Sequence, residues 1–290
     1  MKKRVIVLGA LFAILSFTKT NAQILSDKTM GAIGKGVSGF TFSDADAAAL
    51  AKQSIAELDA NNPVADSKDG YSIRLERLFG KHTASEGVSL NYKVYLVKDI
   101  NAFACADGSV RVFAGLMDIM DDNQLLAVIG HEIGHVVNHD TRDAIKAAYK
   151  KEALLDAASS QSGKVETLTQ SQLGQIGSAM IDSKHSRKQE SEADNFSYDF
   201  MKRNGYDVNA VESAFRILQN LSEGAEASFM TKMMSSHPDS GKRADAAKKR
   251  ATKDGLYHAY EQQKIVNTAP VTATKKTATT AKKKSTAKKK

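Results

Sequence analysis

The chain has 290 residues, 42% of them hydrophobic and 26% charged, which suits one sizeable globular domain or two small ones. Its net charge of +8 comes from its ends: residues 1–22 hold four basic residues, 268–290 hold eight lysines, and neither segment has an acid. Without these twelve basic residues, the rest of the chain has 29 basic and 33 acidic residues. The net charge of this central part therefore argues against nucleic-acid binding by it. The absence of Trp and the 7% aromatic content give no sign of aromatic stacking platforms.

The N-terminus has the pattern of an export signal. Lys2, Lys3 and Arg4 precede the apolar run 5–17, which is too short to span a bilayer comfortably. Thr20-Asn21-Ala22 then offers a cleavage site, so we expect a signal peptide at 1–22 and a periplasmic chain, with secretion or membrane association ranked lower. An uncleaved N-terminal anchor is the alternative.

The elements expected after the signal begin with a Gly-rich flexible lead-in at 23–42. A helix should run from Ser43 or Asp44 to Asp59, because Asn61-Asn62-Pro63 stops it, and a second helix should cover 72–79. Apolar alternation at 90–96 and the apolar positions 103, 110 and 112 predict strands, with Asp107-Gly108 as the turn of a hairpin.

From Asp121 onward the chain reads as helical. Asp121 or Asp122 should cap a helix running through 131–135, and the further helices are expected at 189–204, 208–222, 225–235 and 240–252. The Ser/Gln/Gly-rich stretch 159–183 is interpreted as a mobile or partly helical excursion near the site. The lysine-rich tail 268–290 cannot bury apolar surface and is expected to be disordered. The prediction is an α+β domain at 43–255, mostly helical, with a small sheet before the 131–135 helix.

His131 and His135 are the key pair. Four residues apart on a helix, they lie on one face and can approach the same ion, while Glu132 can contact a water on that ion. The pattern His-Glu-x-x-His predicts a zinc site with Glu132 as general base. The alternative is a buried helix with two hydrogen-bonded core histidines. The single Cys105 cannot form an internal disulfide and is expected to be buried, so any metal must use His and carboxylate ligands.

A catalytic zinc takes three protein ligands and leaves one position open. His139 shares a face with His135. However, a helix rises about 6 Å in every four residues, and His131 and His139 are two such steps apart, so one ion cannot easily reach both. Glu190 is the better third ligand. Asp194 lies one turn further on and can orient a zinc-bound histidine. An ordinary acidic helix face is the alternative reading of Glu190 and Asp194.

The segments 131–135 and 190–194 together resemble the gluzincin metallopeptidases of the HtpX and CAAX-prenyl-protease type, above all their soluble exported bacterial members. Asn101-Ala102-Phe103-Ala104, with Val110 and Val112, is similar to the family's edge-strand segment, and Ser236-His237-Pro238 with Arg243 to its late His-Pro and Arg element. The likeness covers residues 40–250. It departs at 105–108, where many relatives have a Pro-Gly-Gly-like turn, and in the lack of a lipidated Cys.

The resemblance implies one zinc per chain and peptide-bond hydrolysis. It makes His237 and Arg243 the candidates for stabilising the oxyanion, and Asn101, Ala102, Val110 and Val112 the candidates for binding an extended substrate at a sheet edge. Such binding depends mainly on hydrogen bonds to the peptide backbone and less on side chains, so broad specificity is expected, with unfolded or misfolded proteins as the substrates. Two other roles stay open: a zinc-bound chaperone or assembly factor with little proteolysis, and binding of polyanions or an anionic surface through the lysine-rich tail.

Overall fold

The computed structural model describes residues 43–159, 168–223 and 236–267. The predicted signal peptide, lead-in and lysine-rich tail, and the helix expected at 225–235, lie outside these ranges. Within them, no helix is both long and apolar enough to cross a membrane.

The first two helices confirm the sequence prediction. Helix α2 (Asp44–Asn61) begins at Ser43, whose side chain accepts a hydrogen bond from the backbone of Asp46, while the Asp46 carboxylate accepts one from the Ser43 amide. This reciprocal capping satisfies two of the backbone donors that a helix start leaves free. Helix α3 (Gly70–Phe79) follows after Asp69, which caps it.

The three-stranded sheet has the order β3-β5-β4, with β3 (Asn91–Tyr95) parallel and β4 (Ala102–Ala104) antiparallel to β5 (Ser109–Phe113). The predicted hairpin of β4 and β5 is confirmed. Gly108 in its turn has φ +81°, and a Cβ there would lie 1.8 Å from the carbonyl oxygen of Ser89, so only glycine fits. Two short strands, β1 (Ala84–Ser85) and β2 (Val88–Ser89), form a separate hairpin.

One expectation about this sheet is wrong. Val110 and Val112 lie on the central strand β5, which is paired on both sides, so they cannot receive a substrate strand. The sequence analysis missed this because β3 pairs with β5 in parallel, although β4 lies between them in the sequence. The spacing of apolar residues along the chain gives no sign of such pairing. Within the described ranges no strand lies on the outer side of β4, so the open edge belongs to Ala102–Ala104.

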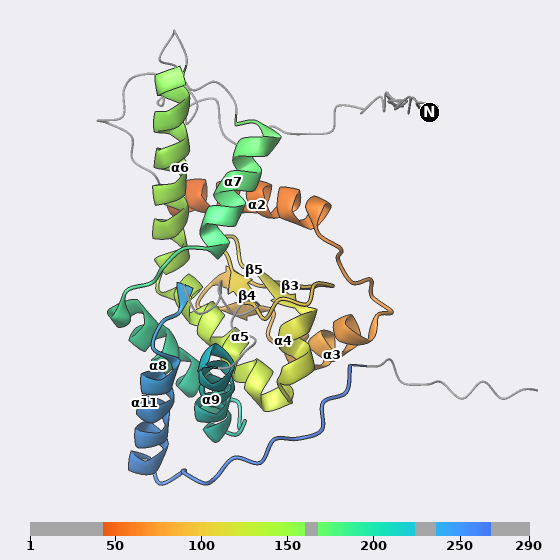
Figure 1. Cartoon of the computed structure of the whole chain (residues 1–290), viewed down its shortest axis with the longest axis vertical. Coiled ribbons are helices and arrows are strands. Elements are labelled where there is room, and N and C mark those ends of the chain that lie inside the picture. Colours follow the sequence, from red (N-terminus) through yellow and green to blue (C-terminus); the bar gives the residue numbers. More distant parts are fainter. Residues whose placement is uncertain (1–42, 160–167, 224–235, 268–290) are drawn as a thin grey trace, which may run out of the picture.

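The remaining helices surround this sheet (Figure 1). They are α4 (Ala114–Ile119), α5 (Asp122–Val137), α6 (Asp140–Ser159), α7 (Gln170–Ile181), α8 (Arg187–Arg203), α9 (Asn209–Glu223) and α11 (Ser240–Lys253). Helix α5, capped by Asp121, confirms the predicted histidine-bearing helix, and α8, α9 and α11 confirm three others. The short α4 was not expected, and the excursion at 159–183 contains the regular helix α7.

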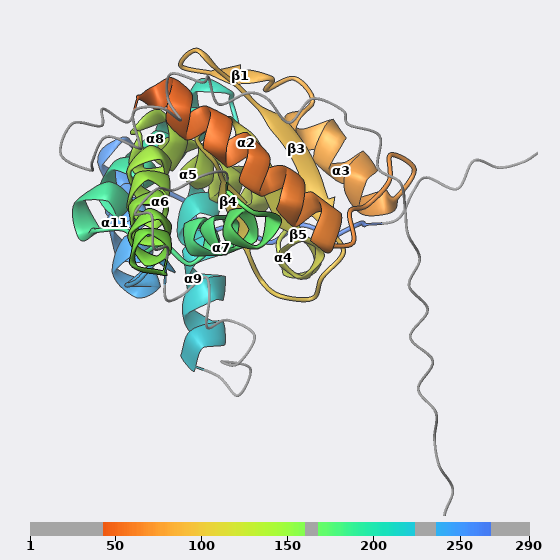
Figure 2. The same ribbon diagram turned by 90° about the horizontal axis from the view of Figure 1, so that it is seen from above.

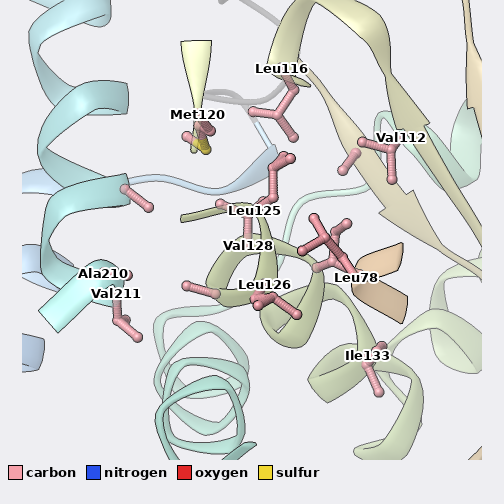
Figure 3. Packing of buried hydrophobic residues seen from close by; sticks show 14 of the residues in the cluster. Leu78, Val112, Leu116, Met120, Leu125, Leu126, Val128, Ile133, Ala210 and Val211 are labelled. Carbon is pink, nitrogen blue, oxygen red and sulfur yellow. The ribbon is translucent and has the colours of Figure 1, made fainter. Parts of the chain in front are cut away.

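Helix α5 is the centre of the fold and is buried along most of its length. Its apolar side chains pack with those of the sheet and of α9, as the labelled Leu125, Leu126 and Val128 show (Figure 3). Helix α8 packs closely on the other side because Gly134 has no side chain: a Cβ there would lie 3.0 Å from the Cα of Ala193. This close approach brings the first turn of α8 to the histidines.

Helices α2, α6 and α7 pack side by side and cover the sheet with a second apolar cluster (Figure 2). Cys105 lies in this cluster and is 1% exposed, as expected, and burial raises the pKa of its thiol. The guanidinium of Arg111 on β5 is also buried and binds both carboxylate oxygens of Asp59 on α2, at 2.8 and 3.0 Å. This ion pair fixes the helical layer to the sheet.

Replacing Asp59 with Ala should lower the free energy of unfolding by about 3 kcal/mol, because it leaves the buried Arg111 guanidinium without its partner. Urea unfolding of the two proteins, followed by circular dichroism, measures the difference. Asp99→Ala, at an exposed acid outside this pair, is the control and should change stability by less than about 0.5 kcal/mol. Equal stability of Asp59→Ala and the wild type would contradict the role given to the ion pair.

The described residues continue past 255, to 267. Residues 254–267 form an extended strap that runs from the end of α11 back to α3 and α4 (Figure 1, blue). The hydroxyl of Tyr260 and the backbone N–H of Gln263 both donate to the Asp121 carboxylate at 2.7 Å. At its end, the side-chain amide of Asn267 donates to the Met117 carbonyl. Hydrogen bonds rather than periodic apolar residues hold the strap, so the sequence pattern did not reveal it.

Candidate metal centre

The two motif histidines face each other across one turn of α5. Both imidazoles are buried, and their Nε2 atoms lie 3.0 Å apart. Because α5 is enclosed by the sheet and two other helices, its rings cannot turn toward solvent, and a pair of nitrogens at this distance needs a shared proton or a shared cation.

Glu190 reaches the pair from the first turn of α8. Ser186 caps this helix, and its capping box with Gln189 fixes the turn that carries Glu190. One Glu190 carboxylate oxygen lies 3.5 Å from Nε2 of His135 and the other 3.6 Å from Nε2 of His131. Ligand atoms about 2.1 Å from a tetrahedral zinc are roughly 3.4 Å apart, so this donor set has the spacing that zinc requires.

His237 adds a fourth donor to the cluster. Its Nδ1 lies 3.0 Å from a Glu190 oxygen and 3.3 Å from Nε2 of His131, and all four residues can offer an atom to one ion. Its Nε2 is 3.7 Å from the Glu132 carboxylate. The resemblance placed His237 at the site as an oxyanion donor; its position within ligand distance of the other three was not foreseen.

Carboxylates orient both motif histidines. Asp194 lies 2.9 Å from Nδ1 of His131. Asp140, at the start of α6, lies 2.9 Å from Nδ1 of His135 and accepts a hydrogen bond from the side chain of Gln189. Acids placed behind histidines in this way fix the ring orientation and leave the other nitrogen free for a metal. Sequence reasoning missed Asp140, although an acid just past the end of a His-Glu-x-x-His helix is a usable signal.

The contacts of Arg243 favour a purpose other than the one expected. Its guanidinium is buried and lies 2.7 Å from Glu190 and 2.6 Å from Asp194, and it also covers the ring of Phe215. Both carboxylates have other partners in the site, so Arg243 holds the two acids in place. This geometry favours a positioning role over direct contact with an oxyanion.

The electrostatics of the cluster suit a cation. Burial and the nearby Arg243 charge hold the pKa of His131 well below its usual value, so its imidazole is neutral, the form that binds a metal. Burial opposes a charge on His135, but hydrogen bonds to Asp140 and Glu190 outweigh it and raise the pKa of His135 to about 9. Glu190 is ionised: burial works against this, but His135 and His237 lower its pKa strongly.

Glu132 is buried beside this cluster, and burial raises its pKa. Among the described residues its Oε1 has no hydrogen-bond partner. It lines a cavity of about 20 Å³ together with strand β4, His185 and His237, and that volume holds about one water molecule. A carboxylate oxygen that faces a water-sized space and has no hydrogen-bond partner among the described residues, next to a His, His, Glu donor set, fits the site of a hydrolytic zinc enzyme.

Comparison with known proteins agrees with this geometry. Residues 73–251 match the sequence pattern of peptidase family M48. The chain belongs to family M48. It is 42% identical over 219 residues to metalloprotease YcaL of Escherichia coli (strain K12), covering 73% of this chain and 84% of that protein. It is 38% identical over 220 residues to metalloprotease LoiP of the same strain, covering 75% and 85%.

A shorter match, 40% identical over 65 residues, relates 21% of the chain to 22% of the protease HtpX of Xanthomonas euvesicatoria pv. vesicatoria (strain 85-10). The chain is therefore an M48 metallopeptidase. The family match begins in α3 and ends in α11, so it spans both motifs and the His-Pro and Arg element.

Proposed function

We propose that this M48 chain is an exported zinc-dependent metalloendopeptidase that hydrolyses unfolded or misfolded proteins in protein quality control. The observation that carries the proposal is the site itself: Nε2 of His131, Nε2 of His135 and the Glu190 carboxylate at ligand spacing, with the free Oε1 of Glu132 beside them. His131, His135 and Glu190 would hold one zinc per chain.

Bound there, zinc lowers the pKa of a water and polarises the scissile carbonyl. Glu132 is the one acid that lines the water-sized cavity, so it can take a proton from the water and pass it to the leaving amine. His237 reaches the same cavity and can donate a hydrogen bond to the developing oxyanion.

Strand β4 is the proposed place for the substrate backbone. Backbone hydrogen bonds join Asn101 to Phe113 and Cys105 to Ser109. In an antiparallel ladder the intervening residues alternate, so the N–H and C=O groups of Ala102 and Ala104 point away from β5. An extended peptide can pair with them beside Glu132 and be bound through its backbone, which folded proteins do not expose. Met180 and Ile181 line the same narrow cavity, so their side chains must withdraw when a peptide enters.

Activity should depend on zinc and on an unfolded substrate. The mature chain, residues 23–290, should release peptides from unfolded casein, should lose this activity in a chelator, and should regain it when zinc is added back. Peptide release measured by mass spectrometry tests this, and the same assay with a stably folded protein is the control. Full activity after the metal has been removed, confirmed by elemental analysis, would contradict the proposed mechanism.

A second candidate function is a zinc-bound chaperone or assembly factor that seldom cleaves its partners. One observation favours it: His237 lies where it can act as a fourth protein donor, and zinc sites closed by four protein ligands are structural rather than catalytic. We rank it second, because the unpartnered Glu132 carboxylate has no use in a purely structural site.

The two ends of the chain support proposals about its location and partners. Residues 1–22 favour export to the periplasm, and the eight lysines of 268–290 favour contact with polyanions or an anionic surface. Protein isolated from the periplasm should begin at Gln23 and bind heparin with an affinity that falls as salt rises. A chain ending at Asn267 should lose that retention. Equal retention of the full and shortened chains would rule out the tail as the binding element.

A further inference from the structure

The cavity beside Glu132 has a second polar group without a partner. Thr141, in the first turn of α6, lines this cavity, and its hydroxyl oxygen Oγ1 is buried. Among the described residues Oγ1 has no hydrogen-bond partner, and the same holds for Oε1 of Glu132. Five buried side-chain atoms in the described ranges lack a partner, and two of them belong to residues that line this one cavity. Buried polar groups are nearly always hydrogen-bonded, so the pair needs an explanation.

The turn between α5 and α6 places Thr141 at the cavity. Its backbone passes through His139, whose φ of +66° lies in the left-handed region that residues other than glycine rarely adopt. The turn brings Asp140 back to His135, so that the Asp140 carboxylate lies 2.9 Å from Nδ1 of that histidine. The side chain of Gln189 on α8 also donates to Asp140. Because these contacts fix Asp140, they also hold the next residue, Thr141, in its place.

The hydroxyl of Thr141 does not serve the fold. A threonine hydroxyl near the start of a helix often bonds to the backbone of its own turn. Oγ1 of Thr141 makes no such bond to a described residue, so it does not help to stabilise α6. A buried hydroxyl without a partner lowers stability, and valine, which has nearly the same shape, would avoid this cost. Packing and helix formation therefore do not account for a threonine at this position.

Glu132 has the complementary requirement. Nε2 of His237 lies 3.7 Å from its Oε1, too far for a hydrogen bond. The terminal torsion of a glutamate side chain has a broad range, so a carboxylate without hydrogen bonds is not fixed in one orientation. An ionised carboxylate only accepts hydrogen bonds, whereas a hydroxyl also donates one. The cavity of about 20 Å³ has room for a single water, which can donate to Oε1 and accept from Oγ1 of Thr141.

We infer that Thr141 is a positioning residue for the general base. Its hydroxyl and Oε1 of Glu132 bind one water in the cavity, and this holds the carboxylate and the water in the orientation that proton transfer requires. The inference rests on the proposed peptidase function and adds a residue to its mechanism. Thr141 is not among the proposed metal donors, so zinc content does not depend on its hydroxyl.

Thr141→Val tests this inference, because it removes the hydroxyl and nearly keeps the shape of the side chain. On a peptide that the wild type cleaves, it should lower kcat about tenfold and leave KM, zinc content and the urea midpoint unchanged. Thr141→Ser, which keeps the hydroxyl, should retain at least about half of the wild-type kcat. Ser54→Ala is the matched control: it removes a buried, unpartnered hydroxyl of α2 that does not line the cavity, and kcat should stay at the wild-type value.

A crystal structure of the mature wild-type chain gives a readout that does not depend on activity. It should show a water within about 3.2 Å of both Oε1 of Glu132 and Oγ1 of Thr141, and the Thr141→Val structure should lack this water. The inference is overturned if no water lies there, if Thr141→Val keeps the wild-type kcat, or if its kcat falls only together with zinc content or the urea midpoint. If the wild type cleaves neither peptides nor unfolded proteins, the proposed function fails and the catalytic role of Thr141 fails with it, whereas the crystal structure alone decides whether the water site exists.

Discussion

Glu132→Gln is expected to abolish peptide hydrolysis while the protein keeps its metal. The glutamine has the same shape and stays beside His237, but its amide cannot accept a proton from water. General acid–base catalysis contributes about 10²–10⁴ to the rate, so kcat should fall by about a thousandfold or more. Because Glu132 is not among the three proposed ligands, zinc content should remain that of the wild type. Peptide release and elemental analysis on the same samples measure both quantities.

The matched control is Glu192→Gln, the same substitution at an exposed glutamate of α8 whose side chain lies 3.6 Å from Lys188. It should leave activity unchanged. Normal cleavage by Glu132→Gln would overturn the role of Glu132 as base. The Glu132→Gln variant also separates the two candidate functions. If it restores growth or envelope integrity to a deletion strain as fully as the wild type does, the result supports the chaperone function, and proteolysis is not the physiological activity.

Glu190→Ala is expected to remove the metal. The substitution leaves two imidazole nitrogens as donors and takes away the carboxylate among the three proposed ligands. Loss of an orienting group already costs metal sites about 10–100-fold in affinity, so loss of a ligand should cost at least about 100-fold. The change also leaves Arg243 with Asp194 as its remaining ion-pair partner, which adds to the destabilisation.

Two measurements test this. Elemental analysis should find less than stoichiometric zinc in Glu190→Ala, and thermal unfolding should become insensitive to chelator, whereas the wild type should lose stability when its metal is removed. The second readout applies even to a weakened fold, because it compares each protein with itself. Glu192→Ala, on the same helix, should behave like the wild type. A stoichiometric zinc in Glu190→Ala would mean that another group, such as His237, supplies the third ligand.

Local patterns in the sequence predicted most of the helices and the centre of the site. The spacing of His131 and His135 follows from helical geometry, and that geometry holds wherever the helix lies in the fold. Caps were visible for the same reason: Ser43 and Asp121 act on their own first turns. Glu190 could be found because a metal site with two histidines needs a further donor and a paired acid motif offered one.

The rest depended on contacts between distant segments. The parallel pairing of β3 with β5, which moves Val110 and Val112 to the centre of the sheet, has no signature in either strand. His185 is one residue in a polar stretch, and only the docking of α8 against α5 stacks it on His135.

The strap at 254–267 determines how the protein responds to proteolytic removal of its C-terminal residues. The Asp121 carboxylate caps the helix that carries the histidines, and it is also the acceptor for Tyr260 and Gln263. A protease that removed the chain end from Gly255 onward would leave every donor of the metal centre intact. The shortened product would nonetheless have a less firmly held catalytic helix, loosened at the end opposite its histidines, so damage at the C-terminus would show first as heat sensitivity and only later as lost metal.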